Sequence, residues 1–401
     1  MTKQATSGWF EGLSRNTVFL ALASLFSDIS TEMLYPLLPV FLTQVLGAGG
    51  SVVGLIEGVA EGVQNAAQGF AGSLSDRMRQ RKPLTLAGFA LSAISKPLIG
   101  LSVVWPGVLG ARFSDRLGAG IRGAPRDALV AASADEAHRG KAFGLEGAGD
   151  NAGAFLGPLL ALMLLQLWRV PLRTIFYIAA IPGFLAVLMV LLVREGRTWP
   201  GAKARFDKAL SRFPRAYLAY LAAVGLFSLG NSSNAFLILQ TRAAGASLQT
   251  TILIYAGFNL IAALVSYPAG ALSDRIGRRP LLLAAFAVFL VSYAGFALVH
   301  SVVVAAVLFA FYGVFQGLFR TIGKATASDL SPSELRASGV GWYGATIGIS
   351  SLIASIAAGL LWDRVGHAAV FILGAVFAVA GSVAVMVFVK ADGAPHTARA
   401  N

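Results

Sequence analysis

The sequence predicts an all-α integral membrane protein with twelve transmembrane helices in two pseudo-symmetric six-helix bundles. The 401 residues are 56% hydrophobic and only 13% charged, whereas soluble domains are about 25% charged. Uncharged stretches of about 20 residues, the length that a helix needs to cross a bilayer, recur along the chain, and such long continuous runs exclude a strand barrel. A six-residue motif near residue 72 also returns near residue 270, which indicates a duplicated unit.

Each expected helix is a hydrophobic segment bounded by polar or glycine-rich residues. The first follows a polar start and contains Asp28 and Glu32 with no small-residue cleavage site, so we expect a retained helix and not a signal peptide. The expected ranges are 16–44, 51–74, 83–104, 106–128, 140–167, 173–194, 214–243, 248–272, 280–299, 302–327, 333–362 and 366–390.

The division into halves follows from the longest polar segment and from an internal repeat. Residues 194–215 contain seven basic residues and two prolines, so we expect a cytoplasmic linker between an N-terminal half, 1–193, and a C-terminal half, 216–401. The sequence GSLSDR from Gly72 recurs as GALSDR from Gly270, at an offset of 198 residues, and Leu25-Phe26-Ser27 recurs as Leu226-Phe227-Ser228 at an offset of 201. Parallel repeats of this kind place a site between the halves near mid-membrane.

The distribution of positive charge predicts the orientation. The net charge is +13, but the basic residues recur between hydrophobic segments and form no single arm, so nucleic acid is not an expected partner. Four of the 32 lie on one side of the expected helices and 24 on the other, which predicts a multi-pass protein of the plasma (inner) membrane with both termini cytoplasmic. The first four are Arg169, Arg173, Arg242 and Arg364, and the four expected inside helices are Lys96, Arg112, Arg116 and Arg320.

Several function classes find no support in the sequence. The chain has no cysteine, no nucleophile with a base at useful spacing and no nucleotide-binding Gly-x-x-x-x-Gly-Lys-Ser/Thr loop. We therefore expect neither an enzyme nor a cofactor, and an ion gradient in place of ATP as the energy source. The expected partners are a small molecule or ion, protons and the lipid bilayer, with the monomer as the working unit.

The repeated motif carries a resemblance to a known family. GSLSDRMRQRKP and GALSDRIGRRP resemble the signature loop of the major facilitator superfamily, although the first copy has Arg79 and Gln80 where the family has one glycine. The resemblance covers essentially the whole chain. It implies a latch that governs conformational switching, against the simpler reading of a basic loop with a tight turn. The implied latch residues are Gly72, Asp76, Arg77, Gly270, Asp274 and Arg275.

Gly153-x-x-x-Gly157-Pro158 resembles the antiporter motif of proton-coupled exporters in the same superfamily, with Leu160 and Ala161 in place of a glycine pair. The alternative role of such a motif is close helix packing. Segments such as SDISTEMLYPLLPVFL also resemble bacterial drug and heavy-metal efflux permeases, although the tail has a single histidine where nickel-resistance members often carry many. The resemblance implies export.

Ionisable side chains inside expected helices are the candidates for function, because each costs about 2.5–3.5 kcal/mol at a helix centre on insertion scales. Asp28 and Glu32 are four residues apart, as are Glu57 and Glu61, so each pair lies on one helix face. In the N-terminal half, seven expected intramembrane acids against three expected bases leave a surplus of about four carboxylates. The acids are Asp28, Glu32, Glu57, Glu61, Asp115, Glu146 and Asp150, and the bases are Lys96, Arg112 and Arg116.

Unpaired carboxylates in a dry cavity bind either a proton or a cation. We expect proton coupling at Glu57 and Glu61 first, with Asp28, Glu32 and Asp150 as further sites, and we expect Asp28 and Glu32 to hold the cation. The alternative is a structural network in which the arginines neutralise the acids. The expected substrate-binding residues are Asp28, Glu32, Tyr35, Glu57, Glu61, Asn65, Arg112, Arg116, Asn231, Asn234, Tyr255, Asn259 and Gln316.

The function predicted from these features is proton-coupled efflux of a cationic small solute by alternating access, with a divalent metal and an organic cation both open. Carboxylates and amide oxygens suit hard or borderline cations, whereas the lack of cysteine and of a mid-membrane histidine argues against a soft-metal site, and the metal ligands are left open. The alternatives are a proton-coupled exporter of neutral or amphipathic drugs and an uptake permease for an anionic nutrient. Arg320 is expected to pair with Asp329 or Glu334, and Lys324 to lie near the cytoplasmic surface.

Overall fold

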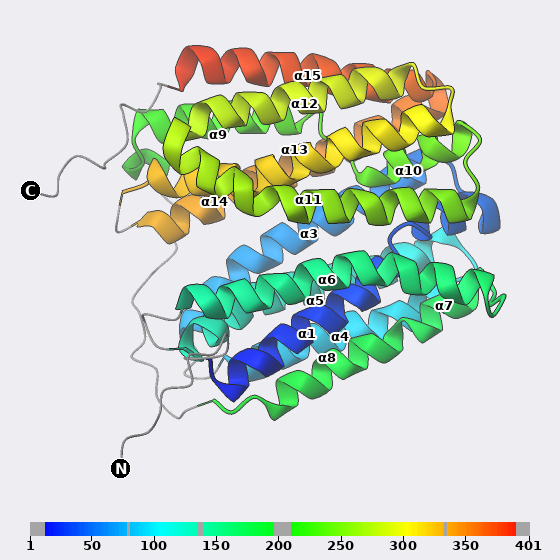
Figure 1. Cartoon of the computed structure of the whole chain (residues 1–401), viewed down its shortest axis with the longest axis horizontal. Helices are drawn as coiled ribbons and strands as arrows, with labels where there is room; N and C mark the ends of the chain where they lie inside the picture. Colours follow the sequence, from blue (N-terminus) through cyan, green and yellow to red (C-terminus); the bar gives the residue numbers. More distant parts are fainter. Residues whose placement is uncertain (1–12, 78–80, 135–138, 196–209, 333–334, 390–401) are drawn as a thin grey trace, which may run out of the picture.

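The computed structural model describes residues 13–77, 81–134, 139–195, 210–332 and 335–389. In these ranges the chain is a bundle of helices that run along one common direction (Figure 1). Extended structure within them amounts to one isolated bridge between Leu13 and Ala134.

The helices follow the expected segments in order. In the first part they are α1 (Arg15–Glu32), α2 (Leu38–Val40), the π-helix η1 (Phe41–Val45), α3 (Gly50–Arg77), α4 (Lys82–Leu101), α5 (Trp105–Ala132), α6 (Arg139–Gln166), α7 (Leu172–Ile178) and α8 (Ala180–Leu192). In the second part they are the short η3 (Leu210–Arg212), α9 (Arg215–Ser228), α10 (Asn234–Ala243), α11 (Leu248–Ile276), α12 (Arg278–Ala297), α13 (Val302–Asp329), α14 (Arg336–Arg364) and α15 (His367–Phe388).

Eight helical stretches of the described chain are long and apolar enough to cross a bilayer: α4, most of α6, α7 with α8, α11, α12, α13, α14 and α15. Helices α1, α3 and α5 fall outside this group, and each contains buried polar or charged side chains. The all-helical membrane fold therefore stands, and the number of twelve crossings stays a prediction.

Three segments expected as continuous helices are broken, and proline explains two of the breaks. The segment 16–44 ends its first helix at Glu32 and turns before Pro36, because proline disfavours helical backbone in the residue before it. The segment 173–194 breaks at Ala179, three residues before Pro182, which cannot donate to the carbonyl of Ile178.

The third break lies in the segment 214–243, where α9 ends at Ser228 and α10 begins at Asn234. Ser233 caps α10, since its hydroxyl accepts a hydrogen bond from the backbone N–H of Ala235. Gly230 lets this unwound stretch approach α15, because a Cβ at this position would lie 2.8 Å from the carbonyl oxygen of Gly374. Both copies of the repeated first segment are thus interrupted.

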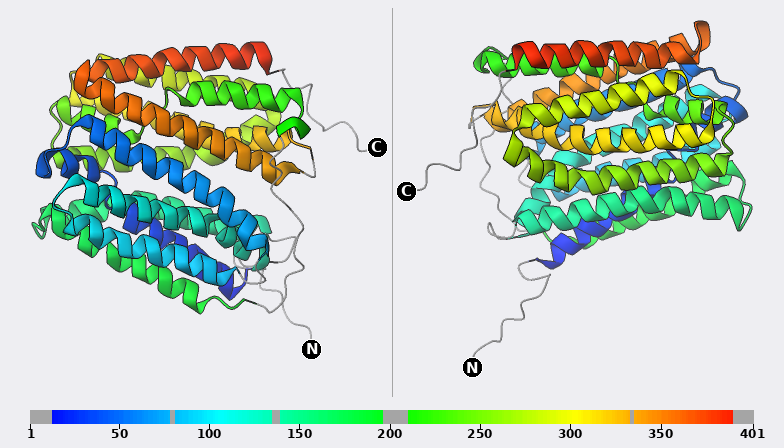
Figure 2. Two further views of the ribbon diagram at one scale, coloured as in Figure 1. Left: turned by 180° about the vertical axis from the view of Figure 1, so that it is seen from behind. Right: turned by 45° about the horizontal axis from the view of Figure 1, so that its top comes forward.

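Two sets of helices pack side by side (Figure 2). Most helices of α1 and α3 to α8 contact mainly one another, as do most of α9 to α15. The sets meet chiefly where α6 lies along α11 and where α3 lies along α14, which is the most extensive helix contact in the described chain. The N-terminal end of α1 and the C-terminal end of α15 lie at the same end of the bundle (Figure 1). The division at residues 193 and 216 remains a prediction, since residues 196–209 lie outside the described chain.

The second helix set has an aromatic core. The ring of Phe227 stacks on that of Phe286 at a centroid distance of 3.8 Å. It also contacts Phe289 at 4.9 Å and Phe319 at 5.4 Å. All these side chains are at most 4% exposed, so this half is held together by ring packing between α9, α12 and α13.

Candidate transport cavity

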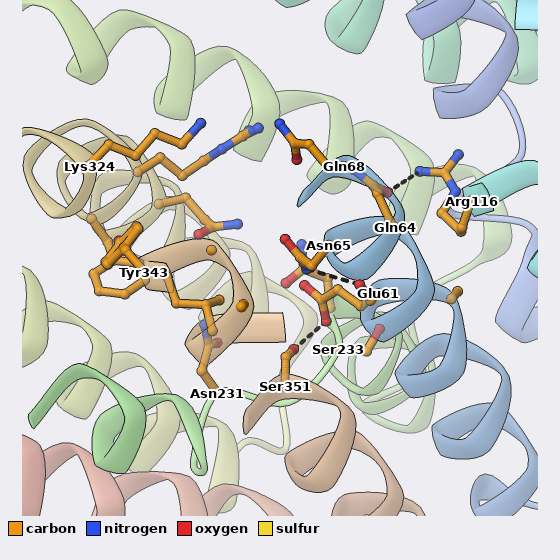
Figure 3. Close-up of a pocket in the computed structure, with 18 of the residues that line it drawn as sticks. Glu61, Gln64, Asn65, Gln68, Arg116, Asn231, Ser233, Lys324, Tyr343 and Ser351 are labelled. Carbon is orange, nitrogen blue, oxygen red and sulfur yellow. Dashed lines mark hydrogen bonds between the residues drawn. The ribbon is translucent and has the colours of Figure 1, made fainter. Parts of the chain in front are cut away.

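A cavity of about 930 Å³ lies between the two helix sets. Its wall comes from α1, α3 and α5 on one side and from α11, α13, α14 and the unwound stretch before α10 on the other. Asp127, Lys324 and Ser338 line it near the ends of α5, α13 and α14 that lie beside the chain termini. Figure 3 shows Lys324 and Gln68 on opposite walls.

The other end of the cavity is closed where α3 meets α14. A Cβ on Gly54 would lie 2.1 Å from the carbonyl oxygen of Ser355, so the two backbones touch at this glycine. Asp363 of α14 accepts hydrogen bonds from the backbone N–H groups of Gly50 and Ser51, each at 2.7 Å, and so satisfies the N-terminus of α3. The cavity is therefore accessible from the end that carries the termini.

The unwound stretch between α9 and α10 supplies polar groups to the wall. Asn231, Ser233 and Asn234 all line the cavity. The hydroxyl of Tyr312 donates to the side-chain oxygen of Asn234 at 2.8 Å and lies 3.2 Å from that of Asn231. Non-helical backbone at membrane depth is tolerated where it lines such a cavity, which accounts for the break inside an expected helix.

Glu61 of α3 lines the cavity. Its carboxylate accepts a hydrogen bond from the hydroxyl of Ser351 on α14, and Asn65 one turn later donates to the Glu61 carbonyl at 2.9 Å (Figure 3). No Lys or Arg of the described chain lies within 4.0 Å of the Glu61 carboxylate. Its bonding partner comes from the opposite helix set.

Glu32, at the end of α1, has a similar environment. It lines the cavity and accepts a hydrogen bond from the hydroxyl of Tyr255 on α11 at 2.9 Å. The rings of Tyr255 and Tyr35 are stacked at a centroid distance of 5.3 Å. Within the described residues Glu32 also lacks a cationic partner inside 4.0 Å, so both carboxylates bond to hydroxyl groups across the two helix sets.

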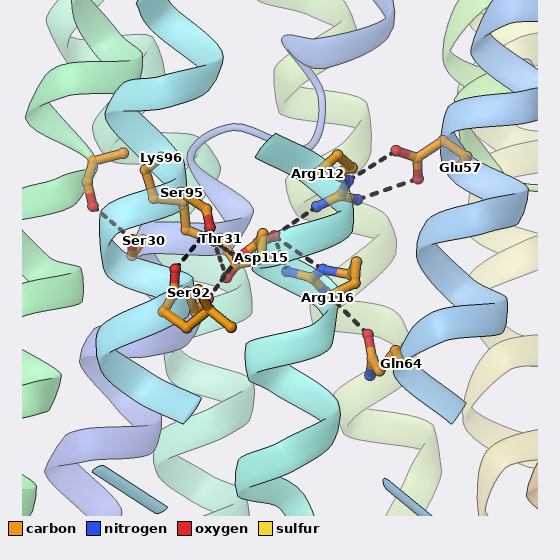
Figure 4. A network of polar contacts seen from close by, with 12 residues as sticks. Ser30, Thr31, Glu57, Gln64, Ser92, Ser95, Lys96, Arg112, Asp115 and Arg116 are labelled. Carbon is orange, nitrogen blue, oxygen red and sulfur yellow. Dashed lines mark hydrogen bonds and ion pairs between the residues drawn. The ribbon is translucent and has the colours of Figure 1, made fainter. Parts of the chain in front are cut away.

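Glu57, in contrast, belongs to an ion-pair network. Arg112 binds it with two bonds, Nε to Oε1 at 3.0 Å and Nη2 to Oε2 at 3.2 Å. Asp115 is the centre of the network, since it pairs with Lys96 at 2.5 Å, Arg116 at 2.6 Å and Arg112 at 3.1 Å (Figure 4). Asp115 is fully buried, so the network braces α3, α4 and α5 against one another.

A second charge cluster lies between α1, α5 and α6, outside the cavity wall. The carboxyl groups of Asp28 and Asp150 lie within hydrogen-bonding reach of each other. Arg126 pairs with Glu146 at 2.9 Å and lies 3.8 Å from Asp150. Arg122 is 8% exposed and packs on the ring of Phe89 at 4.4 Å, and its Nη1 has no hydrogen-bond partner among the described residues.

This cluster corrects the expected charge count. Arg122 and Arg126 were assigned to the basic cytoplasmic side, yet both lie within α5 and take part in the helix packing. Their position inside the expected segment 106–128 was the signal for this. Of the seven acids, three have no ion pair in the described chain, compared with the expected surplus of about four. They are Asp28, Glu32 and Glu61.

Most of the expected binding and coupling residues line the cavity, and the others lie in the charge cluster between α1, α5 and α6. Asn259 and Gln316 line the cavity, and Asn259 donates to the carbonyl of Ala154 on α6 at 3.0 Å. Asp28 and Asp150 do not contribute to the cavity wall as defined by its lining side chains. The residues that do are Glu32, Tyr35, Glu57, Glu61, Asn65, Arg112, Arg116, Asn231, Asn234, Tyr255, Asn259 and Gln316.

Two basic residues that were not among the expected binding residues also contribute to the cavity wall. Arg320 and Lys324 of α13 both line the open part of the cavity. The expected partner Asp329 instead pairs with Arg278 at 3.0 Å, and Glu334 lies outside the described residues. The cavity wall therefore has the two hydroxyl-bonded carboxylates, the Arg112–Glu57 pair and, nearer the mouth, the cations Arg320 and Lys324, so it is not uniformly acidic.

The sequence motifs have different outcomes. The side chains of Asp76, Arg77 and Asp274 lie outside the described part of the structure, so the latch stays a prediction. Gly72 lies in α3 and Gly270 in α11, and Arg275 is exposed. A Cβ on Gly153 would lie 2.6 Å from the carbonyl oxygen of Leu25, and one on Gly157 2.9 Å from that of Ile29. This glycine motif, with Pro158 inside α6, therefore serves close packing against α1, and its role in antiport remains untested.

Comparisons with known proteins agree with this architecture. The family model described as Major Facilitator Superfamily matches residues 20–240 and 220–401. An uncharacterized MFS-type transporter of Methanocaldococcus jannaschii is 34% identical over 373 residues, which cover 92% of this chain and 93% of the relative. A probable 4-methylmuconolactone transporter of Cupriavidus pinatubonensis is 30% identical, with 84% and 81% covered.

A multidrug resistance protein MdtG of Enterobacter lignolyticus is 28% identical, with 68% of each chain covered. Among solved structures, a point mutant of the nucleoside transporter NupG superposes with a TM-score of 0.76 at 14% identity, over 94% of this chain and all of that one. The structural likeness at this identity concerns the fold alone. With the family model and the archaeal relative both matching nearly the whole chain, the protein belongs to the Major Facilitator Superfamily.

Proposed function

We propose that this transporter exchanges protons for a cationic small solute and exports that solute by alternating access. The proposed topology has twelve crossings of the inner membrane in two halves, 1–193 and 216–401, with both termini and the linker in the cytoplasm. In this orientation the cavity described above faces the cytoplasm, the side from which an exporter takes its substrate.

The observation that carries the proposal is the environment of Glu32 and Glu61. Both are half-buried carboxylates in the cavity wall, and each is bonded to a hydroxyl group of the opposite helix set. A carboxylate in a poorly hydrated site without a cationic partner is neutralised by a proton or by a bound cation. Proton and substrate then compete for the same oxygens, which is the minimum that an antiporter requires.

We rank the candidates for proton coupling by whether an arginine already neutralises their carboxylate. Glu57 is held by Arg112, so its ion pair must open before it can take up a proton, whereas Glu61 and Glu32 require no such step. We therefore place coupling first at Glu61 and Glu32. Asp28 and Asp150, which contact each other outside the cavity wall, are the next candidates.

Aromatic rings favour an organic cation as the substrate. Tyr255 and Phe258 line the cavity beside Glu32, with their ring centroids 5.5 Å apart. Rings next to a carboxylate are the usual recognition elements for organic ammonium groups. In the described chain no group of three or more His, Asp or Glu side chains stands together as a metal ligand set.

The test is proton movement in vesicles that contain the protein and an internal pH-sensitive dye. Organic cations, divalent metals, sugars and carboxylic acids are added in turn under an imposed proton gradient. Cations are expected to trigger proton movement in the wild type. The rate is expected to fall about 100-fold in Glu61→Gln and in Glu32→Gln, in the range for loss of a positioned proton-transfer group.

Asp127→Asn is the matched control, since Asp127 also lines the cavity but is paired with Arg126 and its side chain is 46% exposed. It should retain wild-type coupling. Cation-triggered proton movement that survives both glutamine substitutions would disprove the proposed coupling site.

One observation favours a second function, the transport of an anionic solute. Arg116, Arg320 and Lys324 all contribute to the cavity wall, and they could hold a carboxylate once the acids are protonated. In the same vesicles this function predicts that acids trigger proton movement, that cations do not, and that Arg320→Gln abolishes the response.

A further inference from the structure

A second hollow, of about 510 Å³, lies outside the transport cavity where α1 and α4 begin and α8 ends. Three basic side chains line it, those of Arg15, Lys82 and Arg194, together with Glu195 and the apolar residues 191–193. These residues come from three places in the sequence and take no part in the cavity wall.

Both carboxylate oxygens of Glu195, the acidic residue of this hollow, already accept hydrogen bonds from the protein backbone. Glu195 accepts the backbone N–H of Arg81 at 2.6 Å with one oxygen and that of Lys82 at 2.9 Å with the other. It thus caps the N-terminus of α4, where helix N–H groups otherwise lack partners. The Lys82 ammonium donates to the carbonyls of Leu191 and Val193, each at 2.7 Å, which leaves one of its three N–H donors for a ligand.

Asn16 holds the two arginines close together. Its side chain donates to the carbonyl of Arg194 at 2.7 Å and accepts the Arg194 backbone N–H at 3.0 Å. These bonds fix the backbone of Arg194 beside the first turn of α1, which carries Arg15. Both arginines are exposed, and neither guanidinium group has a hydrogen bond or ion pair with another described residue.

The surroundings of the hollow are apolar on the membrane side. Leu191 and Leu192 are 49% and 41% exposed and end the membrane-spanning stretch Leu172–Leu192. A ligand at this level would meet hydrocarbon on one side and three cations on the other. Basic pockets between helices at the cytoplasmic membrane surface suit anionic lipid headgroups, and arginine binds phosphate through two parallel bonds.

We propose that this hollow binds an anionic phospholipid, with the headgroup phosphate between Arg15 and Arg194 and the acyl chains along the exposed leucines of α8. Free phosphate shares the headgroup chemistry but would gain nothing from those leucines. The orientation proposed above puts the site in the cytoplasmic leaflet. The site itself does not depend on which solute the protein transports.

The experiment measures lipid binding by native mass spectrometry on the purified, delipidated protein in a neutral detergent. Phosphatidylglycerol is titrated against phosphatidylcholine for the wild type, for Arg15→Gln/Arg194→Gln and for Arg364→Gln, which removes an exposed arginine at the C-terminal end of α14. Each basic residue near a membrane surface contributes about 1 kcal/mol to anionic lipid binding. The double variant should therefore bind the first phosphatidylglycerol about 30-fold more weakly.

The expected pattern is a loss for phosphatidylglycerol alone, with Arg364→Gln unchanged and with wild-type Tm for both variants in the absence of lipid. Three results would overturn the proposal: unchanged phosphatidylglycerol binding in the double variant, an equal loss for phosphatidylcholine, or displacement of phosphatidylglycerol by inorganic phosphate at the same concentration.

Discussion

The two helix sets share a repeated sequence but are held together by different forces. In the first set Asp115 joins Lys96, Arg112 and Arg116 inside the membrane, whereas in the second Phe227 joins the rings of four other phenylalanines. Buried ion pairs change with protonation and with bound ligand, and ring packing does not. We therefore expect the carboxylates of the first set to carry the titratable chemistry and the aromatic core of the second set to act as a rigid wall.

The largest effect is expected when the charged centre is removed. Asp115→Asn leaves Lys96, Arg112 and Arg116 without their shared partner, and breaking a buried ion pair costs about 3–5 kcal/mol. We expect a marked fall in Tm in detergent together with loss of transport. Asp127→Asn, which removes a 46% exposed carboxylate, should change stability by no more than about 1 kcal/mol. Equal Tm values for the two variants would contradict the contrast between the helix sets.

A smaller effect is expected in the aromatic half. Phe227→Leu keeps an apolar side chain but removes the ring stacked on Phe286, so we expect a loss of about 1–2 kcal/mol, below the range of about 3–5 kcal/mol for Phe→Ala. The substrate affinity and the pH dependence of transport should remain those of the wild type. Phe311→Leu, on a 45% exposed face of α13, is the control for stability. A changed pH profile in Phe227→Leu would show that this half is more than a wall.

The smallest effect concerns a hydrogen bond between the sets. Tyr255→Phe removes the bond to Glu32, worth about 1 kcal/mol, and should lower the population of the conformation described here about fivefold. The chain has no cysteine, so Ser328→Cys introduces one thiol, in the cavity wall. The rate at which a water-soluble maleimide labels this thiol measures the population of the conformation with the open cavity.

Tyr312→Phe is the matched control for that measurement, because its hydroxyl bonds to Asn231 and Asn234 within its own helix set. Its labelling rate should match that of the wild type. Equally slow maleimide labelling in both variants would mean that the bond from Tyr255 to Glu32 does not stabilise this conformation more than a bond within one helix set does.

The sequence predicted the fold well because hydropathy alone locates helices in a membrane protein. The expected segments all contain helix, and the largest errors were the three breaks. Pro36 and Pro182 gave a local signal for two of them. The break at Gly230 depends on the close approach of α15, a tertiary contact that no local pattern contains.

The sequence predicted most of the residues that line the cavity, but it did not predict which of them bond to one another. Helical spacing correctly grouped Glu57 and Glu61 on one face, yet it could not tell that Arg112 reaches the first and Ser351 the second. Those choices depend on which neighbouring helix lies within reach. The same limit applies to Arg122 and Arg126, because only the neighbouring helices decide that these side chains near the end of the expected segment 106–128 pack within the bundle.

The carboxylate of Asp363 joins α14 to the N-terminus of α3 at the closed end of the cavity. The two bonds from Gly50 and Ser51 must break whenever α3 and α14 separate, and water then solvates both partners. A charged cap at a helix N-terminus contributes about 0.3–1 kcal/mol, and up to about 2 kcal/mol where it is partly buried. If the two helix sets move apart during transport, we expect a stronger contact here to slow the opening of this end of the cavity and a weaker contact to speed it.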